Sequence, residues 1–233
     1  MILIKSIILD VDDTLFDFHK SERLALSETL LDLGITPSEE TVALYSRINR
    51  EQWNALERAE VTREELLYRR FDLLFAALGV NASSSAAQSR YERHLGEQVH
   101  FIDGAIELLS ELYGKYKLYV ASNGTAVVQD PRIEKSGIAR YFDGIFISER
   151  VGYNKPDARF FDAVLGAMGK MKKEEIIIFG DGLTSDILGG KNAGIKSCWF
   201  NPSGKKNETD ILPDYEVKSL LDFPKILDKI AKM

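Results

Sequence analysis

Short apolar runs separated by helical patterns are the feature that most restricts the fold of this chain. Four short runs have the length and the β-branched or apolar content of buried strands, and GIFIS fits a fifth strand. In sequence order they are SIILDV (6–11), KLYVAS (117–122), GIFIS (144–148), IIIFGD (176–181) and KSCWFN (196–201). Helical patterns lie between them, at 103–116, 157–170 and 184–194. This alternation predicts an α/β fold, a doubly wound Rossmann-like parallel sheet with its ligand crevice at the carboxyl ends of the strands.

One long segment does not follow this alternation. Residues 16–99 carry helical patterns and no convincing strand, which predicts a helical-bundle cap domain inserted into a catalytic core made of 1–15 and 100–233. Helix starts are expected near Ser38 and at Thr62, which has capping-box spacing to Glu65, and a further helix is expected in 81–95.

Two further expectations concern helices of the core. Pro131 lies inside the helix expected after Ser122, and it should shorten or kink that helix. Residues 217–233 read as one closing amphipathic helix.

Composition excludes several classes of function. The chain has 233 residues, 45% of them hydrophobic, which is enough for a full core without disulfides. Its 36 acidic and 30 basic residues give a net charge of -6, which disfavours a nucleic acid polymer as partner. No apolar run approaches the roughly 18 residues of a membrane span. A lone Cys198 and an early charge in the first residues predict a soluble protein in a reducing, cytoplasmic setting.

Charged and polar clusters follow the expected strands. Asp10, Asp12, Asp13 and Asp17 fall within eight positions, and their mutual repulsion requires a bound cation, a shared proton or exposure to water. The other clusters are Ser122-Asn123-Gly124, Lys155-Pro156 and Gly180-Asp181 with Asp186. Each cluster alone is an ordinary turn or helix entrance. Their shared place at one edge of the sheet predicts a catalytic site.

With the motifs DVDDT, Ser122, Lys155 and GDGLTSD, the sequence resembles the haloacid dehalogenase-like hydrolases over most of its length, including the interrupting helical cap. Within that family, SNGT and GDGLTSDILGGKNAGIKSCWFNP look most like the pyrimidine 5'-nucleotidase branch. Asp13 departs from the glycine that many members have at its position.

The resemblance implies a Mg²⁺-dependent phosphomonoester hydrolase, acting on a small phosphorylated metabolite such as a nucleoside 5'-monophosphate. Asp10 would be the nucleophile and Asp12 the general acid and base. The Mg²⁺ ion would be held by Asp10, Asp181 and the main-chain carbonyl of Asp12, with Asp186 ordering its water ligands.

The remaining implied roles concern the phosphoryl group. Lys155 would neutralise charge, and Ser122, Asn123 and Gly124 would cradle phosphoryl oxygens together with Lys155. Thr14 is expected to hydrogen-bond the turn, and Asp13 and Asp17 to be solvated or structural.

Several alternatives stay open at this point. The substrate could be a sugar phosphate or another small metabolite phosphate. A haloacid dehalogenase shares the aspartate nucleophile but does not need Asp12, Asp181 and Asp186, and a phospho-accepting receiver needs no cap. In the cap, a set of larger side chains could line a base-binding pocket, although helical spacing favours core packing; the set is Trp53, Tyr68, Arg70, Phe71 and Phe101.

Overall fold

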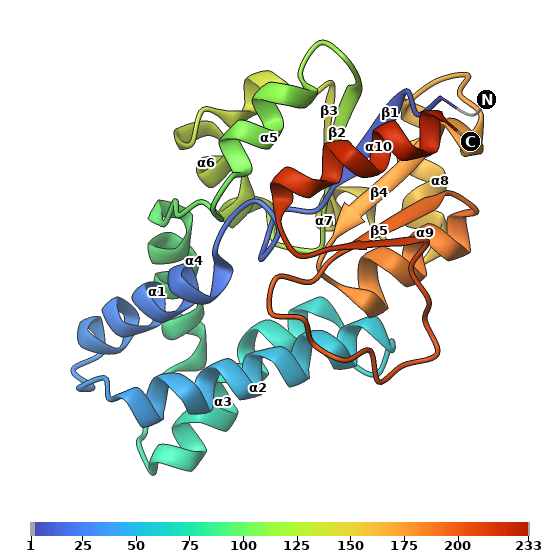
Figure 1. Cartoon of the computed structure of the whole chain (residues 1–233). Helices are drawn as coiled ribbons and strands as arrows, with labels where there is room; N and C mark the ends of the chain where they lie inside the picture. The colour runs from blue at the N-terminus through green and yellow to red at the C-terminus, as the bar shows by residue number, and fades with distance from the viewer. Residues whose placement is uncertain (1–2, 233) are drawn as a thin grey trace. The chain divides into compact units, whose positions relative to one another are not determined.

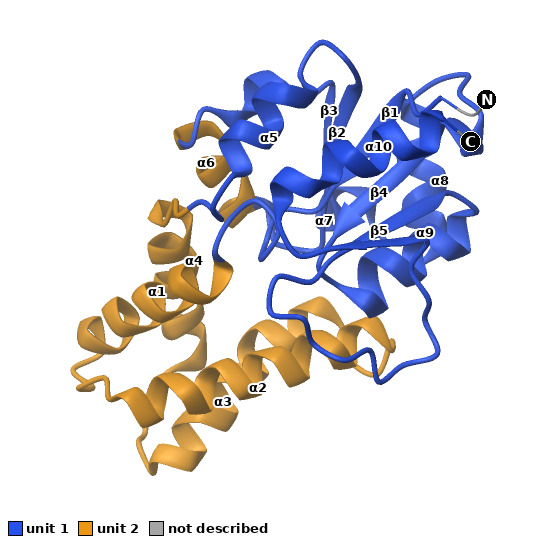
Figure 2. Cartoon of the chain, viewed as in Figure 1, with its two compact units in different colours: residues 1–17, 101–126, 136–233 blue, residues 18–100, 127–135 orange. Residues whose placement is uncertain are grey.

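The computed structural model describes residues 3–232 and divides the chain into two compact units (Figure 2). Unit 1 consists of 1–17, 101–126 and 136–233, and unit 2 consists of 18–100 and 127–135. This grouping differs from the expected division mainly at 127–135, which groups with the helical unit.

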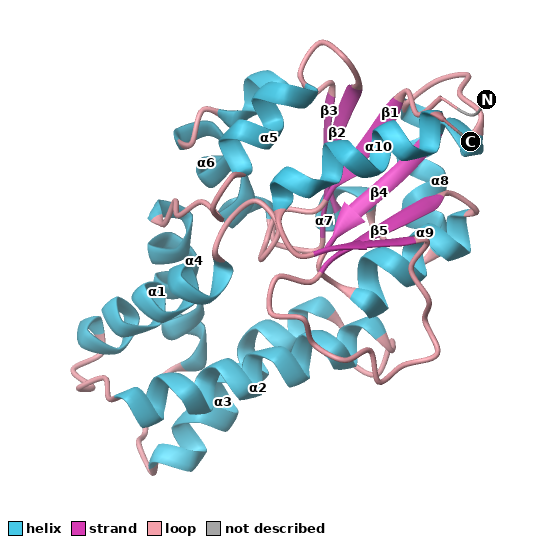
Figure 3. Ribbon diagram, in the orientation of Figure 1, coloured by secondary structure: helices cyan, strands magenta, loops and turns pink. Residues whose placement is uncertain are grey.

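Unit 1 is built on a six-stranded parallel sheet (Figures 1 and 3). Its spatial order is β3-β2-β1-β4-β5-β6, so the chain starts in the middle of the sheet and winds outward in both directions. The strands are β1 (Ser6–Leu9), β2 (Lys117–Ser122), β3 (Gly144–Ile147), β4 (Ile176–Gly180), β5 (Lys196–Phe200) and β6 (Tyr215–Val217). The predicted doubly wound parallel fold is therefore confirmed.

Helices cover both faces of this sheet. Ile8 and Ile178 belong to an apolar cluster with Phe160 and Phe161 of α8. Phe179, the neighbour of Ile178, points to the other face and stacks on Phe223 of α10 with ring centroids 4.1 Å apart. The α-helices of unit 1 are α5 (Ala105–Leu112), α7 (Ser148–Val151), α8 (Ala158–Ala167), α9 (Leu188–Ala193) and α10 (Phe223–Ala231).

Shorter helical turns link these elements. Three are 3-10 turns, at η1 (Ile138–Tyr141), η2 (Lys173–Glu175) and η4 (Leu220–Asp222). The fourth, η3 (Leu183–Ile187), is a π-helical turn directly after β4.

The carboxyl-terminal segment differs from its prediction. A single helix was expected over 217–233, but Val217 ends β6 and α10 begins only at Phe223. The strand was missed because three residues, paired only with β5, are too short to show a period-2 pattern. Helix α10 starts late because the chain must first leave the sheet through η4 and Pro224 favours a first helical turn.

Unit 2 is helical, as expected. It contains α1 (Phe18–Asp32), α2 (Glu39–Glu57), α3 (Arg63–Leu78), α4 (Ser84–Glu97) and most of α6 (Ala126–Lys135). The predicted helix starts are confirmed: the Ser38 side chain accepts a hydrogen bond from the main-chain N–H of Thr41, and Thr62 forms a complete capping box with Glu65. None of the described helices is both long and apolar enough to cross a membrane.

Helix α6 explains why 127–135 groups with unit 2. Val128 belongs to the apolar core of this unit, and the Arg132 guanidinium donates to the main-chain oxygen of Gln98 at 3.1 Å. Pro131 does not end the helix, which continues to Lys135. Its ring lies against Gly96, where an added Cβ would approach Pro131 Cγ to 3.1 Å. A glycine in α4 thus lets the proline pack closely.

Helices α2 and α3 end in the same hydrogen-bonded turn with different residues. In α3 the left-handed position is Gly79, and the next residue, Val80, donates to Phe75 O. In α2 the corresponding residue is Ala59, with φ of 56°, and Glu60 donates to Ala55 O. Glycine is the usual residue at this position because a Cβ is disfavoured in the left-handed region.

We expect the Ala59→Gly substitution to raise the free energy of unfolding by about 1 kcal/mol, because it removes the left-handed penalty at an exposed turn. Gly79→Ala is the matched reverse change and should lower it by a similar amount. Urea unfolding of both variants measures the two effects. Equal effects of the same sign would contradict this account of the turn.

Candidate active site

The parallel strands bring the expected polar clusters to one edge of the sheet. Asp10 directly follows β1, and its N–H donates to the main-chain oxygen of Phe179 in β4 at 3.0 Å. Ser122 ends β2, and Asp181 follows β4. Because the carboxyl ends of parallel strands share an edge, residues more than 160 positions apart in sequence become neighbours.

A buried ammonium group lies at the centre of this edge. Lys155 Nζ is 2.6 Å from Asp10 Oδ1, 2.6 Å from Asp186 Oδ1 and 2.7 Å from the main-chain oxygen of Ala121. Lys155 and Asp186 are each 1% exposed and Asp10 is 7% exposed. The three N–H bonds of the ammonium are therefore all directed at acceptors.

The charges in this cluster control one another's pKa values. Burial raises the pKa of Asp10 to about 7, with repulsion from Asp186 and Asp12 in the same direction and Lys155 opposing it. Burial and repulsion from Asp10 and Asp186 raise the pKa of Asp181 well above its ordinary value. Burial alone would lower the pKa of Lys155, but Asp10 and Asp186 outweigh it and raise that pKa. One lysine does not fully compensate three clustered carboxyls.

Asp181 is held through its main chain. Its N–H donates to Thr14 Oγ1 at 3.1 Å, and its carbonyl oxygen accepts from the indole Nε1 of Trp199 at 2.8 Å. Thr14 Oγ1 also lies 3.4 Å from Asp181 Oδ1. Thr14 was expected to hydrogen-bond the turn, and the structure instead shows its side chain bonded to Asp181, which follows β4, the strand beside β1 in the sheet. Trp199 was not recognised from the sequence, because nothing in its local pattern marks a contact with Asp181.

The acidic residues fit a divalent cation. Among the described residues, Asp10, Asp181 and Asp186 can each offer a carboxylate oxygen within 4.8 Å of the others. Oxygen ligands of this kind suit Mg²⁺. Both oxygens of Asp186 are already engaged, Oδ1 by Lys155 and Oδ2 by the N–H of Gly182 at 3.0 Å. This favours direct ligation by Asp10 and Asp181, with Asp186 in a supporting position.

Asp12 and Asp13 form the turn after β1. Asp12 is half-buried and forms an isolated bridge with Phe16, and the N–H of Asp13 donates to Phe16 O at 2.7 Å. Asp13 has a left-handed φ of 57°. Aspartate tolerates this region better than most residues, so it can occupy a position where glycine would meet no steric penalty.

The residues after β2 support one another and Lys155. Ser122 Oγ accepts from the main-chain N–H of Gly124 at 3.1 Å. The side-chain amide of Asn123 bonds the main chain of Lys155 twice, accepting from its N–H at 2.8 Å and donating to its carbonyl at 2.9 Å. The Asn123 side chain therefore fixes the loop that carries Lys155.

Glycine at position 180 is a requirement that the sequence pattern did not reveal. A Cβ built on Gly180 would lie 2.3 Å from Asp186 Oδ2 and 3.0 Å from Asp10 Cβ. Only a residue without a side chain lets the two carboxylates approach across β4. The signal in the sequence is the glycine immediately before Asp181, but its reason appears only in three dimensions.

The cap residues considered for base binding have different surroundings. Phe71 is fully buried in the core of unit 2, and Arg70 is 3% exposed, bonded to Asn49 Oδ1 at 2.8 Å and to Gln88 Oε1 at 2.7 Å. The idea that these two line an open base pocket is therefore wrong. Phe101 packs on Phe16 in unit 1.

The two remaining candidates lie nearer the surface of unit 2. Trp53 is half-buried with the Arg63 guanidinium 5.9 Å from its ring centre, and Tyr68 is exposed.

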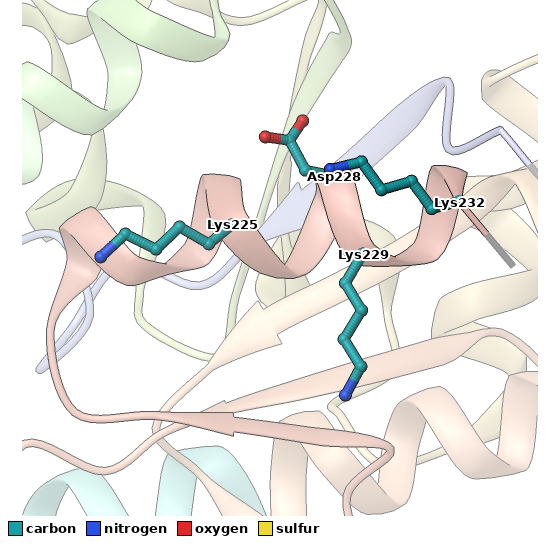
Figure 4. A pocket seen from close by; sticks show the side chains of 4 residues that line it. All are labelled: Lys225, Asp228, Lys229 and Lys232. Atoms are coloured by element: carbon teal, nitrogen blue, oxygen red, sulfur yellow. The ribbon is translucent and has the colours of Figure 1, made fainter.

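A separate hollow along α10 holds none of the predicted site residues (Figure 4). Its lining is three exposed lysines and an aspartate on the solvent face of this helix; these are Lys225, Lys229, Lys232 and Asp228. Lys225 is ion-paired with Asp222 at 2.7 Å. This surface is a solvated helix face rather than a built binding site.

A protein-family model described as haloacid dehalogenase-like hydrolase matches residues 7–200. The pyrimidine 5'-nucleotidase PynA of Streptococcus pneumoniae is 37% identical over 226 residues, covering 97% of this chain and 95% of that protein. The pyrimidine 5'-nucleotidase YjjG of Escherichia coli is 31% identical over 223 residues, covering 96% and 97%.

A solved structure is also similar over nearly its whole length. The HAD-hydrolase YfnB from Bacillus subtilis, in a crystal form bound to magnesium, superposes with a TM-score of 0.93 at 36% identity. The match covers 97% of this chain and 99% of that one.

We expect Gly180→Ala to lower the free energy of unfolding by about 1–3 kcal/mol, because the added methyl group forces apart two carboxylates that Lys155 holds. Gly166→Ala is the control, since a Cβ at that exposed position of α8 meets nothing within 4 Å. It should raise the free energy of unfolding by about 0.5–1 kcal/mol. Thermal unfolding compares the two, and an unchanged Gly180→Ala protein would show that the carboxylates can separate at no cost.

Proposed function

The chain belongs to the haloacid dehalogenase-like hydrolases, and from this premise we propose that it is a Mg²⁺-dependent phosphomonoesterase acting on nucleoside 5'-monophosphates. The observation that carries the proposal is the buried Lys155, shared by Asp10 and Asp186 beside Asp181. This arrangement supplies a carboxylate nucleophile, fixed positive charge and oxygen ligands for a cation at one edge of a sheet.

Asp10 is the proposed nucleophile. One carboxylate oxygen attacks phosphorus, the bond from phosphorus to the ester oxygen breaks, and an aspartyl-phosphate forms. Attack on a phosphate dianion brings like charges together, each pair costing about 4 kcal/mol at 4 Å for an effective dielectric near 20. Lys155 offsets part of this repulsion because its ammonium already contacts Asp10.

Mg²⁺ bound by Asp10, Asp181 and the Asp12 carbonyl would supply further positive charge and keep both carboxyls ionised despite their raised pKa values. Asp186 would support this group, as its two oxygens are engaged by Lys155 and Gly182.

Asp12 is the proposed general acid and base. It gives its proton to the leaving alkoxide in the first step. In the second step the ionised Asp12 takes a proton from water, whose oxygen attacks phosphorus. Inorganic phosphate leaves and the Asp10 carboxylate is restored. Ser122 and main-chain N–H groups of 123–124 cradle the phosphoryl oxygens.

The substrate class rests on the relatives and on charge. PynA and YjjG are named as pyrimidine 5'-nucleotidases, and similarity to both covers nearly the whole chain. A net charge of -6 suits a small ligand held by local groups better than a polyanion. We propose that residues 16–99 act as the cap domain that selects the leaving group, since the residues around Lys155 read only the phosphoryl group.

Two further features of the chain bear on its reaction type and its compartment. Displacement of halide from carbon needs neither a leaving-group acid nor a cation, so Asp12 and Asp181 would have no role in it. The unpaired, buried Cys198 suits a cytoplasmic setting.

The proposal is tested by a phosphate-release screen over nucleoside 5'-monophosphates, hexose phosphates and triose phosphates. We expect the highest kcat/KM for pyrimidine nucleotides, with Mg²⁺ present, and no turnover in EDTA until Mg²⁺ is restored. A hexose phosphate that outruns every nucleotide would reject the nucleotidase assignment and leave the phosphatase. Full turnover in a metal-stripped sample would reject the metal.

The two leading aspartates should differ in what they abolish. Asp10→Asn removes the nucleophile, so no phosphoenzyme should form. Asp12→Asn retains the nucleophile, so a substrate with a good leaving group, such as an aryl phosphate, should still phosphorylate the protein while turnover is slow. The double variant should be little worse than Asp10→Asn, because the two residues act as a unit. Mass spectrometry after acid quenching measures the adduct, and a normal adduct on Asp10→Asn would overturn the assignment.

A further inference from the structure

We propose that Trp199 is a positioning residue for the Mg²⁺ ligand Asp181, acting through a hydrogen bond from its indole N–H to the Asp181 carbonyl. This role rests on the proposed function, because it requires that Asp181 ligates the metal. It assigns a task to a residue at the end of β5, a strand that contributes no side chain to the proposed chemistry.

The hydrogen bond is well placed within the sheet. Trp199 pairs with Gly180 in the parallel register of β4 and β5, so its side chain lies beside the first residues after β4. The indole Nε1 is 2.8 Å from Asp181 O, and Trp199 is only 5% exposed. A buried indole N–H with a single strong acceptor is a fixed contact, because the ring has no room to turn away.

Three hydrogen bonds together immobilise the main chain around Asp181. The N–H of Asp181 donates to Thr14 Oγ1, its carbonyl accepts from Trp199, and the next N–H, of Gly182, donates to Asp186 Oδ2. The peptide units on both sides of Asp181 are therefore fixed. The fixed main chain sets the direction of the Cα–Cβ bond of Asp181, and Thr14 Oγ1 also contacts Asp181 Oδ1 at 3.4 Å, which together preorganise the carboxylate.

Trp199 contributes the one contact of these three that lies outside the acidic motifs. Thr14 and Asp186 both belong to the sequence clusters that carry the site, whereas Trp199 is reached only through the pairing of β5 with β4. Without the indole N–H of Trp199, the peptide between Asp181 and Gly182 keeps the hydrogen bond from its N–H to Asp186 Oδ2. It loses the hydrogen bond to its carbonyl oxygen. The carboxylate of Asp181 would then sample more orientations before metal binds.

The test is Mg²⁺ binding rather than turnover. Trp199→Phe keeps a large aromatic ring but removes the N–H donor, and the Mg²⁺ dissociation constant of the purified full chain, measured by isothermal titration, should rise about tenfold. Trp53→Phe is the matched control, since it alters the other tryptophan of the chain, in unit 2, and should leave that constant unchanged. Melting temperatures in EDTA report any loss of stability separately.

The outcomes separate this role from the proposed function. Failure of the wild-type chain to bind Mg²⁺ would overturn the proposed function and this role with it. Mg²⁺ binding by the wild type with an unchanged dissociation constant for Trp199→Phe would overturn the positioning role alone, including when the melting temperature in EDTA falls. A raised constant with a preserved melting temperature supports it.

A second measurement does not depend on the folding of Trp199→Phe. In Trp53→Phe the only tryptophan is Trp199, whose N–H is bonded to the metal-ligating residue. In EDTA its fluorescence should be poorly quenched by acrylamide, because the indole is buried and hydrogen-bonded before the metal binds. Quenching as strong as that of an exposed tryptophan would overturn the proposal.

Discussion

The buried ammonium of Lys155 is the constraint on which the rest of unit 1 depends. A charge with 1% exposure is tolerated only with partners, and removing one partner of a buried pair typically costs about 3–5 kcal/mol. Each partner comes from a different place in the chain: Asp10 after β1, Asp186 in η3 and the Ala121 carbonyl in β2. The ammonium thus ties together three elements at the edge of the sheet. It also leaves the cluster with an excess of negative charge, which is why a divalent cation fits there and a neutral ligand would not.

Local backbone features allow these charges to approach. Gly180 leaves space for the Asp186 carboxylate, and η3 has the wider turn of a π-helix, in which the N–H of Ile187 reaches Gly182 O. π-helical turns are rare and often occur at functional sites. Here the turn places Asp186 so that one oxygen faces Lys155 and the other faces the N–H of Gly182. A regular α-helix starting at Leu183 would rotate the side chain at 186 relative to β4. The uncommon turn is therefore part of the electrostatic arrangement.

The sequence predicted those features that have a local signature. Buried strands of four to six residues, a capping box at Thr62 and long helical patterns can be read directly from residue order. Three kinds of feature could not be read in this way. Strand β6 is too short to show a period, and the bonds of Thr14 and Trp199 to Asp181 join residues 167 and 18 positions apart. The third is the direction of a polar side chain: Arg70 has the sequence environment of a binding residue, yet it faces inward to Asn49 and Gln88. Each of these depends on tertiary contacts that propensity and periodicity do not encode.

Each unit contains a buried cationic side chain, Lys155 in unit 1 and Arg70 in unit 2, and the two differ in the partners that surround them. In unit 2, Arg70 donates to the side-chain amides of Asn49 and Gln88. Its guanidinium lies over the rings of Tyr91 and Phe71, and Asn49 in turn donates to Glu22. Networks of this kind can often be replaced by apolar residues of similar volume without loss of stability. In unit 1, Lys155 bonds two carboxylates directly and leaves Asp181 unneutralised beside them. An apolar replacement there could fill the same volume, but it would remove the fixed charge that the proposed attack of Asp10 on a phosphate requires. Arg70 therefore defines how helices of unit 2 pack, whereas Lys155 defines what the surface at the end of the sheet can bind.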